Sequence, residues 1–391
     1  MKKSNYYLLI IIGLFSVLNY VPFNPINVSI LIYFSFIILI LNNISNILKQ
    51  IKDKIYILFV IILILIYYYF IYLFNNNIYT GDLYAIILSF FIFMVFSSIK
   101  YKISDRNRLI NIISIISITF TMFSVLYYYK TFLSTENYIE GQYYFKGKNG
   151  LGPMLSFAGF WFLYNINKTS KKVFNFILFL ISLILLAYIK ARTSFLALLI
   201  VSIIFIIKKI KLNRIKTISL LIILLIILLV FCKYINYFLL SAFNIDFINK
   251  SLNGYIDNSE YLDIISSGRV DHYKYGFYLL NINPMFGACF DKYKVSNAIG
   301  NSVGIHSFFI RSLGYGGIFY LSIVLLLILF YIIYFKRYCE DKKITVYLML
   351  IGLIGMLFEP IAPFGPGTSY LLFWIILCLN NKKNINEELN T

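Results

Sequence analysis

The two histidines of this 391-residue chain are its best candidates for acid–base chemistry. An imidazole titrates near neutral pH and can take a proton from a hydroxyl group. His306 is followed by Ser307 and, a few residues later, by Gly314, Gly316 and Gly317, where a long apolar run begins. We predict that His306 is the catalytic base; the alternative is a histidine with a purely structural role.

The other histidine belongs to a segment that reads as a helix. Residues 266–269 read Ser-Ser-Gly-Arg, which resembles a helix start, and an Asn-Pro pair at 283–284 would end the helix. Arg269, His272, Tyr273 and Gly276 then fall at i, i+3, i+4 and i+7, which places a cation, an imidazole and a phenol on one face. We predict that Arg269 is catalytic and that His272 and Tyr273 bind substrate. An amphipathic helix lying at the membrane interface would give the same pattern.

Arg192 is the third predicted catalytic residue. It lies with Lys190 in a short turn between two apolar runs. A guanidinium offers a planar fork of donors that matches phosphate oxygens, so this turn is a candidate anion site in which Lys190 would also bind substrate. The alternative is that both side chains extend to lipid headgroups.

Two further charged residues lie at the ends of apolar runs. Arg311 lies at the mouth of the span expected from residue 316 and could pair with the substrate or with Glu359. Glu359 precedes Pro360, and a single carboxylate in such a place is more often a structural partner than a catalyst. Both are predicted to contribute to substrate binding.

No metal, cofactor or disulfide is expected. The cysteines have no repeated spacing and are Cys232, Cys289, Cys339 and Cys378. Metal-dependent membrane glycosyltransferases use paired acids in an early outer loop, and residues 22–25 contain none. Walker and glycine-rich nucleotide motifs are also missing, which excludes ATP-driven pumping by this chain alone.

The elements that must position these residues are membrane-spanning helices. The chain is 60% hydrophobic and only 13% charged, so a soluble enzyme, a secreted disulfide scaffold and a disordered protein are excluded. We expect an all-α polytopic membrane protein, a single integral domain over residues 1–391 with about 12 transmembrane helices. The expected spans are 6–21, 26–41, 55–74, 83–99, 109–129, 151–166, 173–189, 194–207, 217–240, 316–335, 344–358 and 368–380.

The positions of the charges give the orientation. The net charge is +19, with 35 Lys and Arg against 16 Asp and Glu, and no basic patch with interleaved aromatics suggests nucleic acid. If the N-terminus is cytoplasmic, most Lys and Arg residues fall in inner loops, whereas the outer connections 22–25, 75–82 and 359–367 contain none. No small-residue cleavage site follows Val21, so we expect the first span to be retained and both termini to be cytoplasmic.

Two outer segments are longer than connections between packed helices usually are. One covers residues 130–150, and the other, residues 241–315, is a loop of roughly 75 residues before the tenth span. The longer loop carries both histidines, so we expect it to hold part of the active site.

Together these motifs resemble the O-antigen polymerase and O-antigen ligase superfamily of bacterial integral membrane glycosyltransferases. Arg192 with Leu196, the segment from Arg269 to Asn-Pro-Met-Phe-Gly at 283–287, and His306-Ser307 followed by Gly317 are similar to motifs of that family, in the same order. Here Ser307 stands where asparagine is common, and Lys190-Ala191 precedes Arg192 where serine is usual.

The resemblance implies the reaction. The donor would be a glycan on undecaprenyl pyrophosphate, and a sugar hydroxyl of a second glycan would attack its anomeric carbon at the outer face of the inner membrane. Arg192 and Arg269 would bind the pyrophosphate, and His306 would orient or deprotonate the acceptor hydroxyl. A chain-length regulator and a flippase are the protein partners that it implies, beside membrane lipids.

Three activities fit these features. A polymerase would extend repeat units of O-antigen, capsule or exopolysaccharide, and a ligase would transfer finished glycan to lipid A core. We favour the polymerase because such genes are more numerous and divergent. A flippase of lipid-linked oligosaccharide would require charges deep within the spans and symmetric halves, and neither is evident.

Overall fold

The protein is described from a computed structural model. It describes residues 3–21, 28–75, 77–132, 148–166, 168–189, 191–210, 269–299, 305–360, 363 and 368–381. The side chains of residues 128–132, 148, 210, 269–271, 296–299 and 368 are not included. Lys190, the expected span 217–240, residues 133–147 of the first expected long loop and residues 241–268 and 300–304 of the second therefore lie outside the described residues.

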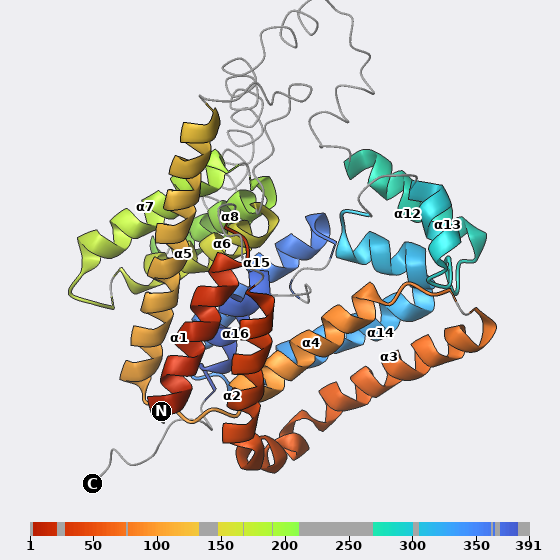
Figure 1. The fold of residues 1–391 in the computed structure, drawn as a ribbon, viewed down its shortest axis with the longest axis horizontal. Helices are drawn as coiled ribbons and strands as arrows, with labels where there is room; N and C mark the ends of the chain where they lie inside the picture. The colour runs from red at the N-terminus through yellow and green to blue at the C-terminus, as the bar shows by residue number, and fades with distance from the viewer. Residues whose placement is uncertain are drawn as a thin grey trace, which may run out of the picture.

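The described residues form helices and no named strand. This is the expected architecture, because an apolar segment in a bilayer must satisfy its own backbone hydrogen bonds. The helices are α1 (Lys3–Leu18), α2 (Ser29–Lys49), η1 (Ile51–Lys54), α3 (Ile55–Phe74), α4 (Gly81–Phe96), α5 (Ile103–Phe132), α6 (Lys148–Asn165), α7 (Lys172–Tyr188), α8 (Arg192–Ile210), α12 (Arg269–Ile282), α13 (Lys292–Ile299), α14 (Phe308–Tyr338), α15 (Lys342–Phe358), η2 (Thr368–Tyr370) and α16 (Leu371–Cys378) (Figure 1).

Four of these helical segments are long and apolar enough to cross a membrane: Ser29–Lys49, Ile51–Phe74, Ile103–Tyr127 and Phe308–Tyr338. Three shorter apolar helices, Lys3–Leu18, Gly81–Phe96 and Lys172–Tyr188, also coincide with expected spans. The described part of the chain is therefore helical where spans were expected, while the count of about 12 spans stays a prediction.

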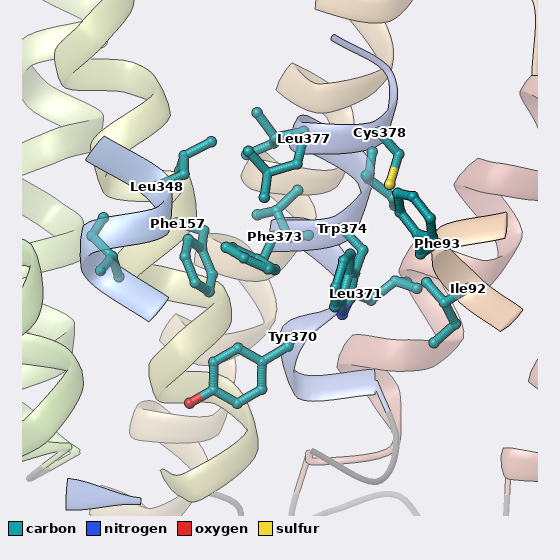
Figure 2. Close-up of a cluster of buried hydrophobic side chains, with 14 of the residues drawn as sticks. Ile92, Phe93, Phe157, Leu348, Tyr370, Leu371, Phe373, Trp374, Leu377 and Cys378 are labelled. Atoms are coloured by element: carbon teal, nitrogen blue, oxygen red, sulfur yellow. The ribbon is translucent and has the colours of Figure 1, made fainter. Parts of the chain in front are cut away.

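The centre of the bundle is built around α16, whose residues Leu371 to Cys378 are all buried. Phe373 packs on Phe157 of α6 with ring centroids 5.2 Å apart, and Trp374 packs on Phe93 of α4 at 6.2 Å (Figure 2). Aromatic pairs at such distances add to the stabilisation from burial alone. This short helix thus packs against both α4 and α6.

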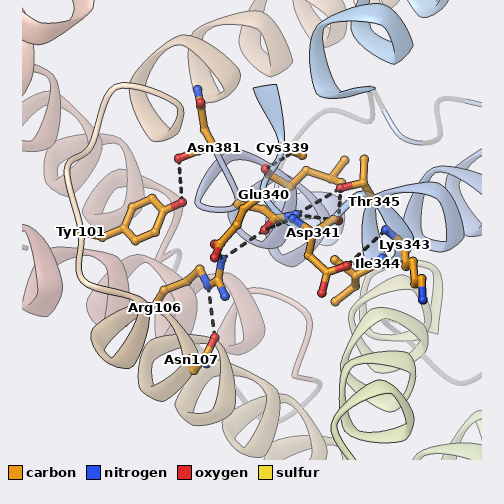
Figure 3. A network of polar contacts seen from close by, with 12 residues as sticks. Tyr101, Arg106, Asn107, Cys339, Glu340, Asp341, Lys343, Ile344, Thr345 and Asn381 are labelled. Carbon is orange, nitrogen blue, oxygen red and sulfur yellow. Dashed lines mark hydrogen bonds and ion pairs between the residues drawn. The ribbon is translucent and has the colours of Figure 1, made fainter. Parts of the chain in front are cut away.

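One end of the bundle is held by a network of charged and polar groups. Arg106 of α5 donates to Glu340 at 3.0 Å and to the side chain of Asn380 at 3.1 Å (Figure 3). Lys168, just after α6, forms an ion pair of 2.7 Å with Asp341, which caps α15 by accepting from the amides of its first turn. We call this the basic end of the bundle.

The packing of α6, α8 and α15 fixes which residues lie at the opposite end. Phe205, late in α8, packs on Tyr164, late in α6, and on Tyr347, early in α15. At the other end of the same helices, a side chain on Gly152 of α6 would meet Ala191, directly before α8. Arg192 therefore lies at the end opposite the basic end, where α15 finishes.

Candidate functional site

The structure brings the two histidines together. The rings of His272, on α12, and His306, just before α14, have centroids 4.8 Å apart and planes at 79°. Nδ1 of each ring is buried. They are 34 positions apart in the sequence and come together because α12 packs along α14. The predicted base thus has a second imidazole as its direct neighbour.

Two glycines allow the backbones of α12 and α14 to approach closely enough for this contact. A Cβ on Gly276 would lie 2.3 Å from Cγ2 of Ile310, and a Cβ on Gly314 would lie 2.8 Å from the carbonyl oxygen of Gly276. Both distances are shorter than van der Waals contact, so only glycine fits at either position without displacing a helix. Gly276, which the helical spacing placed on the face of His272, therefore has a packing role.

The turn after α12 is hydrogen-bonded to α14 where that helix is interrupted. Gly317 has φ +67°, which interrupts α14 and frees backbone groups there. The amide of Ala288 donates to the carbonyl of Gly314 at 2.9 Å, and the amide of Ile318 donates to the carbonyl of Pro284 at 3.0 Å. The motif that ends at residue 287 and the glycines after His306 are therefore joined by backbone hydrogen bonds.

Backbone strain in the same turn is offset by burial. Cys289 and Phe290 have φ of 53° and 51°, a left-handed conformation that costs about 1–2 kcal/mol for a residue with a side chain. Phe290 is fully buried, and its amide donates to the carbonyl of Tyr315 at 2.9 Å. Burial raises the pKa of the Cys289 thiol, so this group stays protonated and is a poor nucleophile.

Arg311 has a different partner from the expected one. Its guanidinium pairs with Asp82 of α4, with Nε 2.9 Å from Oδ2 and Nη2 2.7 Å from Oδ1, rather than with Glu359. Tyr79 accepts a further hydrogen bond from Arg311 at 2.9 Å, and Tyr315 lies 5.0 Å from the guanidinium carbon. Both charged side chains are buried, and a buried guanidinium requires a carboxylate partner.

Asp82 and Tyr79 were missed by the sequence analysis. They belong to the expected outer connection 75–82, which was considered only for its lack of Lys and Arg; in the structure Tyr79 precedes α4 and Asp82 lies in its first turn. The backbone of this connection also joins the site, since the amide of Tyr79 donates to the carbonyl of Phe290 at 2.7 Å. The sequence did contain a signal for this pair. Asp82 stands at the start of one apolar run and Arg311 at the start of another, and a guanidinium in such a place needs an anion as its partner.

Tyr273, Glu359, Arg192 and the backbone of Arg269 lie at the same end of the bundle as the histidine pair, whereas Lys190 lies outside the described residues. Tyr273 donates a hydrogen bond to the carbonyl of Leu357 at 2.9 Å, which attaches α12 to the last turn of α15. Glu359 follows as the C-cap of α15 and is half-buried. Arg192 begins α8 at this end and is also half-buried, and Arg269 begins α12.

The described residues contain no group of three His, Cys, Asp or Glu side chains that could hold a metal ion. The groups that the structure gathers near His306 are instead an imidazole, a buried ion pair and several phenols. The two imidazoles are groups that can transfer a proton, whereas the charge of Arg311 is already neutralised by Asp82.

Comparison with protein families agrees with this assembly of motifs. A family model described as O-antigen ligase matches residues 177–321. This match covers residues 177–321 alone and supports the resemblance to the O-antigen polymerase and ligase superfamily. The matched region contains Arg192, Arg269, His272, His306 and Arg311, and it ends just after the break in α14. Asp82 and Glu359 lie outside the matched region. The comparison with curated proteins gives no match.

Proposed function

We propose that the protein is a polymerase of lipid-linked oligosaccharide repeat units. It would transfer glycan from undecaprenyl pyrophosphate to a sugar hydroxyl of an acceptor glycan. The family match supports the broader class, an O-antigen polymerase or ligase. The observation that carries the proposal is the contact of 4.8 Å between His272 and His306, at the end of the bundle where Arg192 begins α8.

In the proposed reaction, the acceptor oxygen forms a bond to the anomeric carbon of the donor, and the bond from that carbon to the pyrophosphate breaks. His306 takes the proton of the acceptor hydroxyl, while His272 holds the ring of His306 in place by its edge-to-face contact. Arg192 and Arg269 neutralise the negative charge that develops on the pyrophosphate. The leaving group supplies the free energy, so the chain needs no nucleotide.

The distribution of charge supports an orientation with the histidine pair at the outer face of the membrane. Arg106 and Lys168 lie at the basic end, opposite the histidine pair, and Lys336, Arg337 and Lys342 lie beside the same α14–α15 connection. Because cytoplasmic loops carry an excess of Lys and Arg, we place the basic end and both termini in the cytoplasm. The inner membrane of a bacterium is the proposed location.

The ligase is the second candidate function, and the description of the matching family favours it directly. Both activities use the same donor chemistry and differ only in the acceptor. Deletion of the gene, with the intact gene restored as control, separates them when surface and lipid-linked glycans are resolved by size. Surface molecules with a single repeat support the polymerase. Long glycan on undecaprenyl pyrophosphate with a bare surface supports the ligase, and single repeats trapped at the cytoplasmic leaflet refute both.

The catalytic assignment is tested by complementing the deletion with single variants. His306→Ala and Arg192→Ala should insert normally but restore no polymer, since loss of a general base alone lowers a rate by about 10²–10⁴-fold. Lys292→Ala is the control, because it removes an exposed cation from the same outer region. A variant of His306 or Arg192 with full activity would remove that residue from the mechanism.

A further inference from the structure

Helix α12 has two opposite faces with different surroundings. His272, Gly276 and Leu279 are buried on the face that packs along α14. The opposite face carries Phe277, Tyr278 and Ile282, which are 49%, 60% and 44% exposed, and Met285 continues it beyond the helix at 51%. We call these four residues the α12 apolar stripe. An exposed surface of this kind in water would be unusual, because soluble proteins rarely leave large apolar side chains grouped on their surface.

The stripe ends beside the start of the apolar run of α14 that follows Gly317. Residues 318–338, after the break at Gly317, are a run of about 20 residues that can cross a bilayer. Their first two amides are bonded to the turn after α12, since Phe319 donates to the carbonyl of Met285 at 3.2 Å and Ile318 to that of Pro284. Met285 therefore lies at the boundary of the hydrocarbon layer.

Aromatic side chains continue this surface onto a second candidate span. Phe286 packs on Phe319 of α14 at 6.2 Å and on Phe70 of α3 at 6.3 Å. Phe70 in turn packs on Phe74 at 5.0 Å, and both are exposed on the outer part of α3. In Figure 1, α12 and α13 lie beside the ends of α3 and α14. The stripe is thus continuous with the lipid-facing surfaces of α3 and α14.

We propose that the α12 apolar stripe is a membrane-docking surface that lies in the outer leaflet of the bilayer. Ile282 and Met285 lie deepest, Phe277 and Tyr278 lie at the interface that aromatic residues favour, and the exposed Lys274 reaches the anionic phosphate headgroups. The docked helix holds His272 on its other face at the level of the headgroups. This inference rests on the proposed orientation of the chain but not on the proposed reaction.

The test measures depth with spin labels on single cysteines. Cys232 and Cys289 are replaced by serine, whereas Cys339 and Cys378 are fully buried and can stay. Labels are placed at Lys274, Tyr278, Ile282 and Met285 in protein reconstituted in vesicles of phosphatidylethanolamine and phosphatidylglycerol. The exposed Leu329, within α14, gives a reference inside the membrane, and the exposed Lys342, at the start of α15, gives an aqueous reference.

We expect the accessibility of the label to a water-soluble nickel complex to fall in the order Lys274, Tyr278, Ile282, Met285, with the last several-fold below the first. Labels at Ile282 and Met285 that are as accessible as the one at Lys342 would overturn the docking surface. Equal depth at all four positions would overturn the proposed orientation. The His306→Ala protein should give the same order, so an inactive protein with the depth gradient separates docking from catalysis.

Discussion

Removing one partner of the buried ion pair between Asp82 and Arg311 should destabilise the protein severely. The closest oxygen and nitrogen are 2.7 Å apart, and the two side chains are 2% and 7% exposed. Unit charges at that distance attract by about 6 kcal/mol at an effective dielectric constant of about 20. Desolvation offsets much of this attraction in the intact pair, but Asp82→Asn leaves a buried guanidinium without its counter-ion. The expected cost is about 3–5 kcal/mol of unfolding free energy.

The assay is unfolding in detergent micelles with an increasing fraction of dodecyl sulfate, followed by the fluorescence of Trp161 and Trp374, which are both buried. Arg311→Gln should cost a similar amount, and the double variant should cost less than the sum of the two because no charge is left unpaired.

The ion pair between Arg106 and Glu340 is a matched control. Its closest atoms are 3.0 Å apart, but its side chains are 11% and 34% exposed, so solvent screens the charges. Glu340→Gln should therefore cost only about 1 kcal/mol or less. If Asp82→Asn costs no more than Glu340→Gln, or if the double variant is fully additive, the reasoning from burial is refuted.

Two further predictions concern close packing and pH. Gly314→Ala should lower the unfolding free energy by about 1–3 kcal/mol and abolish activity, because its Cβ would lie 2.8 Å from the α12 backbone. Gly352→Ala is the control and should be tolerated, because its Cβ would have its nearest neighbour at 3.4 Å. Equal stability of the two variants in the same unfolding assay would contradict this. Burial acts to raise the pKa of Asp341, but hydrogen bonds from Lys168 and Tyr164 lower it below the usual aspartate range. Asp341 should therefore stabilise the protein at neutral pH and lose this effect as the pH falls through its lowered pKa. The unfolding free energy of Asp341→Asn should then match that of the wild type only in acid. A difference in unfolding free energy that does not change with pH would count against the assignment.

Sequence alone determined the local architecture and the order of the motifs. The apolar run predicted for residues 55–74 coincides with α3, since a segment without charges in a bilayer can only be helical. The end predicted for the helix that starts at Arg269 also agrees, because Asn283 accepts from the amides of Met285 and Phe286 and turns the chain there. Such features depend on neighbouring residues and can be read along the chain.

The pairing of distant groups was decided only by the tertiary structure. The sequence could show that Arg311, inside an apolar run, needs an anion, but it offered Glu359, and the fold supplies Asp82, 229 residues away. It placed both histidines in one long outer segment, yet their contact depends on the fit of Gly276 against Gly314. These choices are made by packing between helices, where the approach of two backbones and the burial of a charge set which partners can meet.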